Sequence, residues 1–413
     1  MGAMAAKRHK NELHLRVKCP WRMVVCFVLV GILLAGSHAS LSANGSGDVL
    51  IYAVNDNAAT TYLRYDPGTG SRTEITTLAG FRPFIVSVEG RLALSSNYWG
   101  YEGARGAEGV TVIGTDGQRI QVNAATLPYG SAWAWSPDGQ LLAFTAGPNN
   151  EERDLFVWDG RAALPVFPEG GATHAGLAWM PGPDNRLAAI EWYSYGRDSE
   201  SGDIFLWDER TTVNLSQDLE GIIRDAAWRP NELGSQLAFL HGQDGAYSLL
   251  VWDGVSAPTP DNFTEVAPDV TGWFSNPVWT PTGSLAFRGQ GPDDTHQQIY
   301  LWDGQTVTNI SQKPDLHNGS PVWSADGRWA FVTFFSPEQL ITVRNVDNRT
   351  IAELEGQYTP AWSSDGYLAF CRYGENDWQL HLWDGTQTIL LDQGYEVWAQ
   401  WQQSGAKVGC TSG

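Results

Sequence analysis

A short motif built around tryptophan and an Asp-Gly turn recurs along most of this chain. Its clearest copy runs from Trp135 to Phe144 and reads Trp-Ser-Pro-Asp-Gly-Gln-Leu-Leu-Ala-Phe. The Asp-Gly pair accepts the positive φ angles of a tight hairpin turn, and the apolar residues on both sides are typical of two paired strands. A third strand follows at 154–158 and ends on Trp158-Asp159. Repetition of such a unit predicts a stack or ring of small antiparallel sheets.

The first strand of the unit can be aligned eight times, at intervals of 39 to 51 residues. The aligned residues are Val86, Trp135, Trp179, Trp228, Trp279, Trp323, Trp362 and Trp401. A short, Thr-rich fourth strand completes several units, as at 211–215 and 306–310. Because this interval suits a blade of four strands with their loops, we predict an all-β fold, a β-propeller of eight four-stranded blades, with seven as the fallback. The propeller is expected to form one domain, 48–413.

The two ends of the repeat array complement each other. The array begins with a second strand at 49–54, whereas a spare first strand comes last, at 396–401. Sharing one blade between the N- and C-terminal strands would remove two exposed sheet edges and close the ring. The segment 407–410 duplicates a second strand and is left over in this scheme.

Residues 1–39 have the order of a secretory signal peptide. A basic region is followed by an uncharged apolar run, Met23 to Gly36, and then by small residues such as Ser37 and Ala39. This run is short for a membrane-spanning helix, so we favour cleavage over retention as an anchor, with residues 40–47 as a short linker. The propeller is then expected outside the cytoplasm, secreted or periplasmic, with membrane contact only through an uncleaved N-terminal segment.

The net charge of the chain argues against one class of partner. The formal net charge is −20, and residues 1–39 hold six basic residues and one acidic residue, so the rest of the chain carries 20 basic and 45 acidic side chains and a net charge of −25. Such a surface repels phosphate backbones, which argues against nucleic acid as a partner. We expect a monomer.

Export permits disulfides, and Cys371 and Cys410 are the two cysteines after residue 39. Each follows the tryptophan of its own repeat by nine residues. Equivalent positions in neighbouring blades face the same way and not toward each other. The sequence therefore favours two buried free thiols over a disulfide.

The unit Trp-Ser-Pro-Asp-Gly-x-x-Leu-Ala-Phe, best seen at Trp135–Phe144, Trp323–Phe331 and Trp362–Phe370, resembles the propeller repeat of the TolB family. The Trp-Asp dipeptides also resemble those of the Trp-Asp-repeat propellers, without their Gly-His element. The resemblance covers nearly all of 48–413 and implies an exported β-propeller that serves as a binding scaffold. TolB itself carries an α/β domain ahead of its propeller, which we do not expect here.

Motifs for catalysis and for metal binding are missing from the sequence. The histidines have no metal-ligand spacing, and there is no Gly-x-Ser-x-Gly element, phosphate-binding loop or cysteine cluster. We predict no cofactor and no metal, and we lean against an enzyme. Carboxylate pairs for glycan hydrolysis need not be adjacent in sequence, so a hydrolase stays an alternative.

The residues that differ between equivalent loops are the better candidates for a binding site. Segments entering the first strands should ring the mouth of the central channel, on the face opposite the Asp-Gly turns. The candidate binding residues there are Tyr129, His174, Arg224, Trp273, Phe274, His317, Tyr358 and Tyr395. Loops between second and third strands should lie on the same face and add further aromatic residues, including Tyr373 and Trp378. Aromatic residues mixed with Arg, His and acids suit a protein or an envelope polysaccharide ligand, so the sequence predicts a non-catalytic binding scaffold, with a carbohydrate-binding module as a further alternative.

Overall fold

The computed structural model describes thirteen segments between residues 47 and 411. They are 47–80, 82–95, 109–122, 132–148, 153–167, 173–182, 184–192, 202–230, 234–243, 246–271, 277–313, 315–334 and 339–411. The predicted signal peptide lies outside the described residues, so it stays a prediction. Among the residues that are described, no helix has the length and apolar character needed to span a membrane.

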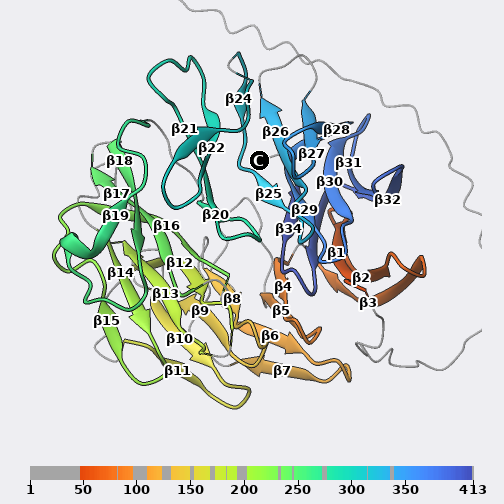
Figure 1. Ribbon diagram of the computed structural model, residues 1–413. Coiled ribbons are helices and arrows are strands. Elements are labelled where there is room, and N and C mark those ends of the chain that lie inside the picture. Colours follow the sequence, from red (N-terminus) through yellow and green to blue (C-terminus); the bar gives the residue numbers. More distant parts are fainter. Residues whose placement is uncertain are drawn as a thin grey trace, which may run out of the picture. The chain divides into compact units, whose positions relative to one another are not determined.

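The described strands form seven hydrogen-bonded sheets, and every strand pair except one is antiparallel (Figure 1). Four of the sheets consist of four consecutive strands each. They are β4(Phe84–Val86) to β7(Arg119–Val122) with β5(Leu92–Ser95) and β6(Val110–Ile113); β8(Trp133–Trp135) to β11(Ala163–Pro165) with β9(Leu142–Ala146) and β10(Asp154–Trp158); β20(Val278–Trp279) to β23(Val307–Asn309) with β21(Leu285–Gly289) and β22(Gln298–Trp302); and β29(Gln357–Trp362) to β32(Thr388–Gly394) with β30(Leu368–Tyr373) and β31(Trp378–Trp383).

An eight-stranded sheet consists of two such groups, joined by a single parallel pair between Gly202 and Ile222. Its strands are β12(Thr173–Trp179), β13(Leu187–Trp192), β14(Gly202–Trp207), β15(Thr212–Asn214), β16(Ile222–Trp228), β17(Leu237–Gln243), β18(Ala246–Trp252) and β19(Phe263–Glu265). In a further sheet the first strand is interrupted, because two short strands both pair with β26. This sheet contains β24(His317–Asn318), β25(Val322–Trp323), β26(Trp329–Phe334), β27(Leu340–Arg344) and β28(Thr350–Glu355).

The described residues contain no α-helix and one short 3-10 helix, η2(Pro260–Asn262). The all-β prediction is therefore confirmed for this part of the chain.

The seventh sheet joins the two ends of the described chain. It has the order β3(Ser71–Ala79), β2(Ala59–Asp66), β1(Leu50–Asn55), β33(Glu396–Trp401) and β34(Lys407–Cys410). All six residues of β1 pair with β33, and Figure 1 shows the red-orange β1 beside the blue C-terminal strands. The predicted pairing of the strand at 49–54 with the strand at 396–401 is confirmed.

The Asp-Gly hairpins form as predicted. In the turn between β8 and β9, Gly139 has a φ of 70°, and its N–H donates to the carbonyl oxygen of Ser136 at 2.8 Å. The Ser136 hydroxyl donates to Asp138 Oδ1 at 2.5 Å and accepts the Leu141 N–H at 2.8 Å. Serine and aspartate therefore supply hydrogen bonds to the turn's own backbone, which is why local sequence could predict the hairpin.

The repeat tryptophans pack one strand group against the next, as the sequence predicted. The indole N–H of Trp179 donates to the backbone oxygen of Ala134 in the preceding group at 3.0 Å. The same bond recurs with Trp228, Trp279 and Trp401 as donors. These buried side chains also take part in the apolar clusters between neighbouring groups, so the tryptophans belong to the framework.

Arginines that precede the second strands strengthen these contacts, a role that the repeat pattern does not predict. Arg91 lies 4.8 Å from the ring centre of Trp135 in the next group and donates to the Gly139 carbonyl oxygen. Arg328 likewise lies 4.9 Å from Trp362 and donates to the Gly366 carbonyl oxygen at 3.1 Å. A planar guanidinium is suited to this double role, because its face stacks on an aromatic ring while its N–H groups donate hydrogen bonds in the plane of the guanidinium itself.

The expectation of two free thiols is wrong. Cys371 on β30 and Cys410 on β34 form a disulfide, with their Cα atoms 5.4 Å apart. The expectation treated β34 as a second strand, but β1 already occupies that place beside β33. The strand β34 therefore pairs with the opposite edge of β33, where it contacts β29 and β30 of the neighbouring sheet. Cys410 is thus not equivalent to Cys371 and can reach it.

Candidate functional site

The segments that enter the first strands lie beside the loops between second and third strands, as predicted. In the seventh sheet, Glu396 at the start of β33 pairs with Asn55 at the end of β1. In β12 and β13, Thr173 pairs with Trp192, and in β24 and β26, His317 pairs with Phe334. Both kinds of segment therefore share one end of these sheets, and we call this end the loop face.

Half of the predicted binding residues can be placed with their side chains. Tyr129, Trp273 and Phe274 lie outside the described residues. The backbone of His174 belongs to β12, but its side chain is not among those described. Arg224, His317, Tyr358 and Tyr395 all lie at the loop face, where they remain candidates for binding.

Tyr358 belongs to an aromatic cluster formed by two segments of the loop face. Its ring centre is 5.3 Å from that of Trp378, whose own ring is 5.0 Å from Tyr373. Trp378 is buried, whereas Tyr358 and Tyr373 are 38% and 49% exposed. The buried indole thus holds two exposed tyrosine rings, so the cluster presents a preformed aromatic surface.

A bulge in β29 places Tyr358 in this cluster. Between Gln357 and Ala361 the strand has two residues more than its partner strand, and Tyr358 has a φ of 63°. A tyrosine in this left-handed region costs about 1 kcal/mol or more, so the surrounding structure must impose it. Bulges commonly re-aim a side chain next to a functional site.

Polar contacts connect this cluster with Tyr395. The Tyr358 hydroxyl donates to the Thr411 carbonyl oxygen at 2.8 Å, and the Thr411 hydroxyl donates to Glu396 at 3.2 Å. Asn55 donates to the other carboxylate oxygen of Glu396 at 3.2 Å and accepts the Tyr395 N–H through its backbone oxygen at 2.9 Å. Tyr395 is 47% exposed. One network therefore orders two predicted binding tyrosines and a carboxylate.

The other two described candidates lie on different sheets. Arg224 stands beside a bulge in β16, and its guanidinium is 5.0 Å from the ring centre of Tyr247. His317 begins β24, and its ring centre is 4.5 Å from that of His296. Burial, followed by the positive charges of His296 and Arg288, lowers the pKa of His317. The proximity of His296 and Arg288 to His317 could not be predicted from the sequence, because contacts between loops of different sheets leave no periodic pattern in it.

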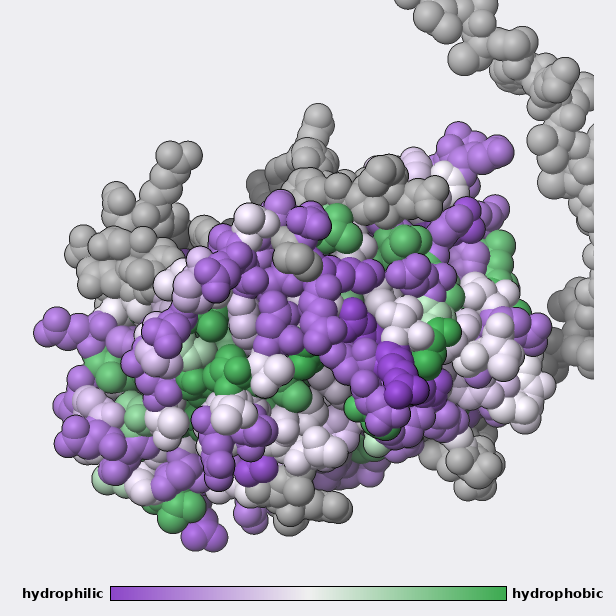
Figure 2. Space-filling model, turned by 45° about the horizontal axis from the view of Figure 1, so that its top comes forward, coloured by the Kyte–Doolittle hydropathy of each residue, from purple (hydrophilic) through white to green (hydrophobic). Residues whose placement is uncertain are grey.

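The face shown in Figure 2 is mostly hydrophilic, and its apolar residues form small separate patches. This pattern agrees with the acidic composition of the chain. The candidate site is identified by its exposed aromatic rings and their polar neighbours, and not by a broad aliphatic surface.

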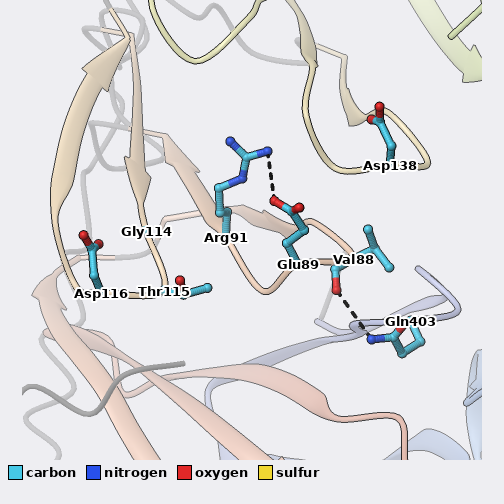
Figure 3. A pocket seen from close by; sticks show the side chains of 8 residues that line it. All are labelled: Val88, Glu89, Arg91, Gly114, Thr115, Asp116, Asp138 and Gln403. Carbon is cyan, nitrogen blue, oxygen red and sulfur yellow. Dashed lines mark hydrogen bonds and ion pairs between the residues drawn. The ribbon is translucent and has the colours of Figure 1, made fainter. Parts of the chain in front are cut away.

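A pocket of about 710 Å³ lies at the opposite end of the sheets, among the hairpin turns (Figure 3). It is lined by Val88, Glu89, Arg91, Gly114, Thr115, Asp116, Asp138 and Gln403. Glu89 is paired with Arg91 at 3.4 Å, and Gln403 donates to the Val88 carbonyl oxygen. Asp138 also stabilises its hairpin turn, and Arg91 stacks on Trp135. These lining side chains therefore already make contacts that stabilise the fold.

Metal-ligating residues do not gather in the described segments, where no group of three or more His, Cys, Asp or Glu side chains could hold an ion. What the loop face offers is stacking surfaces, hydrogen-bonding groups and local positive charge. These are means of binding.

Solved structures share the fold of this chain at low sequence identity. Dipeptidyl peptidase 4 from Porphyromonas gingivalis matches with a TM-score of 0.60 and 13% identity, over 83% of this chain and 59% of the peptidase chain. A eukaryotic initiation factor matches with a TM-score of 0.57 and 13% identity, over 86% of this chain and 99% of the other. This chain thus spans about three fifths of the peptidase.

TolB from Acinetobacter baumannii also matches, over 88% of this chain and 78% of that chain, with 13% identity and a TM-score of 0.39, which is too low to argue from. No protein-family model matches the sequence, and no curated protein matches it. Membership of the TolB repeat family is therefore not shown. Likeness at 13% identity shows the fold alone, and that fold is, at a coarse level, a β-propeller.

Proposed function

We propose that this chain is an exported β-propeller of eight blades whose ring closes in the sheet shared by β1 and β33. Contacts between successive strand groups support this arrangement. The strand pairs that make these contacts include β33 with β4, β4 with β8, β8 with β12, β12 with β16, β16 with β20, β22 with β24, β25 with β29, and β29 with β34. Two buried hydrogen bonds of 3.0 Å also join the Gln400 side chain to the backbone of Val86. The eight-stranded sheet counts as two blades, because a single parallel residue pair is the only strand pairing between its described halves.

We further propose that the loop face binds a protein partner and that the chain itself is not catalytic. The observation that carries this proposal is the aromatic cluster, in which buried Trp378 fixes the exposed rings of Tyr358 and Tyr373. Rigid tyrosines provide large contact areas at little cost in conformational entropy, which is why they are frequent at protein interfaces. The hydrogen-bond network through Glu396 adds Tyr395 to the same surface.

Export is proposed from the sequence of residues 1–39. Release of a chain that begins near residue 40 into the extracytoplasmic fraction is the expected result, and N-terminal sequencing of the protein recovered from that fraction checks it. A chain that keeps Met1 in the cytoplasm would contradict the proposal.

The binding proposal is tested with the double variant Tyr373→Ala/Tyr395→Ala. Neither tyrosine hydroxyl makes a hydrogen bond in the described structure, so their removal should leave the fold intact. Val255→Ser is the matched control, because Val255 is 83% exposed in a turn between third and fourth strands, at the opposite end of its sheet. Partners captured from an extracytoplasmic extract by the wild-type and control proteins should be lost with the double variant. Equal capture by all three proteins would exclude the aromatic cluster as the binding site.

Carbohydrate binding is the second candidate function. It is favoured by the same exposed rings, since sugars stack on tyrosine faces, and by the ordered Glu396 carboxylate, which can accept hydrogen bonds from hydroxyl groups. A glycan array separates the two candidates. Glycan binding that the double variant abolishes would assign the surface to carbohydrate, and chain shortening of the bound glycan would assign it to a hydrolase.

A further inference from the structure

Three basic side chains gather on the loop face between two neighbouring sheets. Arg288 lies near the end of β21, His296 lies in the loop from β21 to β22, and His317 begins β24. The two imidazole rings are nearly perpendicular, with centres 4.5 Å apart. The charge of Arg288 acts on His317 closely enough to lower its pKa, after the larger effect of burial. Outside residues 1–39 the chain carries 20 basic against 45 acidic side chains, so such a grouping runs against its overall charge.

Buried amide side chains fix the backbone around both histidines. Gln298 is fully buried, and its Nε2 donates to the carbonyl oxygens of His296 at 3.3 Å and Leu316 at 3.3 Å. Asn318 is also fully buried, and both its N–H and its Nδ2 donate to the Gln297 carbonyl oxygen at 3.1 Å. The loop and the strand entry are thus hydrogen-bonded to each other, and the backbone beside both histidines is ordered without a ligand.

No carboxylate pairs with Arg288 in the part of the chain that the structure describes. Its guanidinium is half-buried, burial lowers its pKa, and its Nε has no hydrogen-bond partner among the described residues. Asp294 of the same loop is directed elsewhere, because it accepts the Gly291 N–H at 2.9 Å and the Tyr300 hydroxyl. Removing a cation from water without a counter-charge is costly, and an anionic ligand would supply that charge.

We propose that Arg288, His296 and His317 bind a carboxylate group of the ligand. The inference rests on the proposed function, since the three residues belong to the loop face, and it specifies one chemical group that the partner must present. A guanidinium matches the two oxygens of a carboxylate in a planar, bidentate geometry, and imidazole N–H groups can donate to the same oxygens.

The charge of the cluster favours a carboxylate over a phosphate. Two imidazoles whose centres are 4.5 Å apart repel each other when both are charged, and burial, with the charges of His296 and Arg288, lowers the pKa of His317 and favours its neutral form. Arg288 is then the permanent charge of the site. A single charge is balanced by a monoanion, whereas a phosphate near pH 7 carries up to two negative charges.

The test follows the histidine resonances of the purified protein by nuclear magnetic resonance while sodium acetate is added at constant ionic strength. Acetate should shift the signals of His296 and His317 saturably, and acetamide, its neutral analogue, should not. Arg288→Gln should weaken acetate binding about tenfold, the effect of losing one charge-assisted hydrogen-bonding group. Arg349→Gln is the matched control, because Arg349 is an exposed arginine in the turn between β27 and β28 and its loss should change nothing.

Two further probes identify the source of the carboxylate and its specificity. Acetyl-Ala-Ala with a free C-terminus is compared with its C-terminal amide. Binding about tenfold tighter than acetate indicates a peptide terminus as the natural ligand, and binding equal to that of acetate indicates a small carboxylate. Inorganic phosphate that binds more tightly than acetate would overturn the carboxylate assignment.

The proposal also fails if neither acetate nor the free dipeptide gives saturable shifts, or if Arg288→Gln leaves them unchanged. Such a result would neither support nor contradict the proposed function, because capture of a partner through Tyr373 and Tyr395 is measured in a separate experiment. Equal partner capture by the wild type and the Tyr373→Ala/Tyr395→Ala variant, together with intact acetate binding, would have the opposite meaning: the aromatic cluster would not be the binding site, and the carboxylate site would stand.

Discussion

Cys371 and Cys410 are linked by a disulfide that joins two sheets across 39 residues of sequence. Both residues are fully buried, and Cys410 belongs to the last described strand. The disulfide therefore fastens β34 to β30 of the neighbouring sheet, close to the contact between Tyr358 and Thr411. A covalent link at this place secures the C-terminal end of the repeat array.

Replacing both cysteines, in Cys371→Ser/Cys410→Ser, should lower the free energy of unfolding by about 2–4 kcal/mol. The cross-link restricts the unfolded chain, and its removal releases that restriction. Urea unfolding under non-oxidising conditions measures the loss, with the dithiothreitol-reduced wild type as the control. Free thiols at Cys371 and Cys410, found by labelling the oxidised wild type in denaturant and mapping the labelled peptides, would contradict the disulfide itself.

Arg328→Ala should destabilise the protein by about 1–2 kcal/mol. The change removes the stacking on Trp362 at 4.9 Å and the hydrogen bond to the Gly366 carbonyl oxygen. Arg328→Lys should recover part of the loss, because an ammonium keeps the charge but has no planar face. Urea unfolding with Arg349→Ala as the control checks this prediction, and equal stability of the two alanine variants would show that the contact between sheets contributes nothing.

Asp384 should stabilise its turn in a way that depends on pH. The N–H groups of Gln387 and Thr386 donate to its carboxylate and lower its pKa to about 2. Because the pKa is lower in the folded state, the stabilisation is complete above the ordinary value near 4 and is lost as the pH falls through about 2. Asp384→Ala should therefore lower the melting temperature at pH 7, and the difference from wild type should shrink below pH 4. Glu375→Ala, at an exposed loop residue, is the control.

Lys407 should be the more reactive of the two lysines that follow residue 39. Desolvation lowers the pKa of Lys407 to about 8, although its side chain keeps an exposed surface on β34. Lys313, in contrast, donates to Thr342 at 2.8 Å and lies 3.5 Å from Glu353. At pH 8 acetic anhydride should label Lys407 at least ten times faster than Lys313, because about half of the Lys407 amine is unprotonated there and the Lys313 amine is engaged with Thr342 and Glu353. Peptide mass spectrometry measures both rates, and equal rates would contradict the lowered pKa.

Local sequence predicted the strands and turns well because the residues responsible are adjacent in the chain. Ser136, Asp138 and Gly139 satisfy one another's hydrogen bonds, so that hairpin could be recognised without a structure. The repeat tryptophans were correctly assigned to the framework for a related reason. Tryptophans at the same place in successive units can make the same packing contact, as Trp179, Trp228 and Trp279 do.

The candidate site was predicted only in outline. Tyr358 and Tyr395 were named because they precede a repeat tryptophan, but the bulge that gives Tyr358 its left-handed conformation could not be read from the sequence. Nor could the partnership of His317 with His296 and Arg288, since these residues belong to different sheets. The disulfide was missed because its prediction assumed that every unit repeats in space as it does in sequence.

The sequence by itself therefore determined the repeating unit, its hairpin turns, the tryptophan framework and the pairing of β1 with β33. These features follow from hydrogen bonds and apolar contacts that each unit repeats. Tertiary structure alone decided where β34 lies, which cysteine it brings to Cys371, and which loop residues meet. Those choices depend on which strand edge is already occupied and on how neighbouring sheets pack, and neither leaves a periodic signal in the chain.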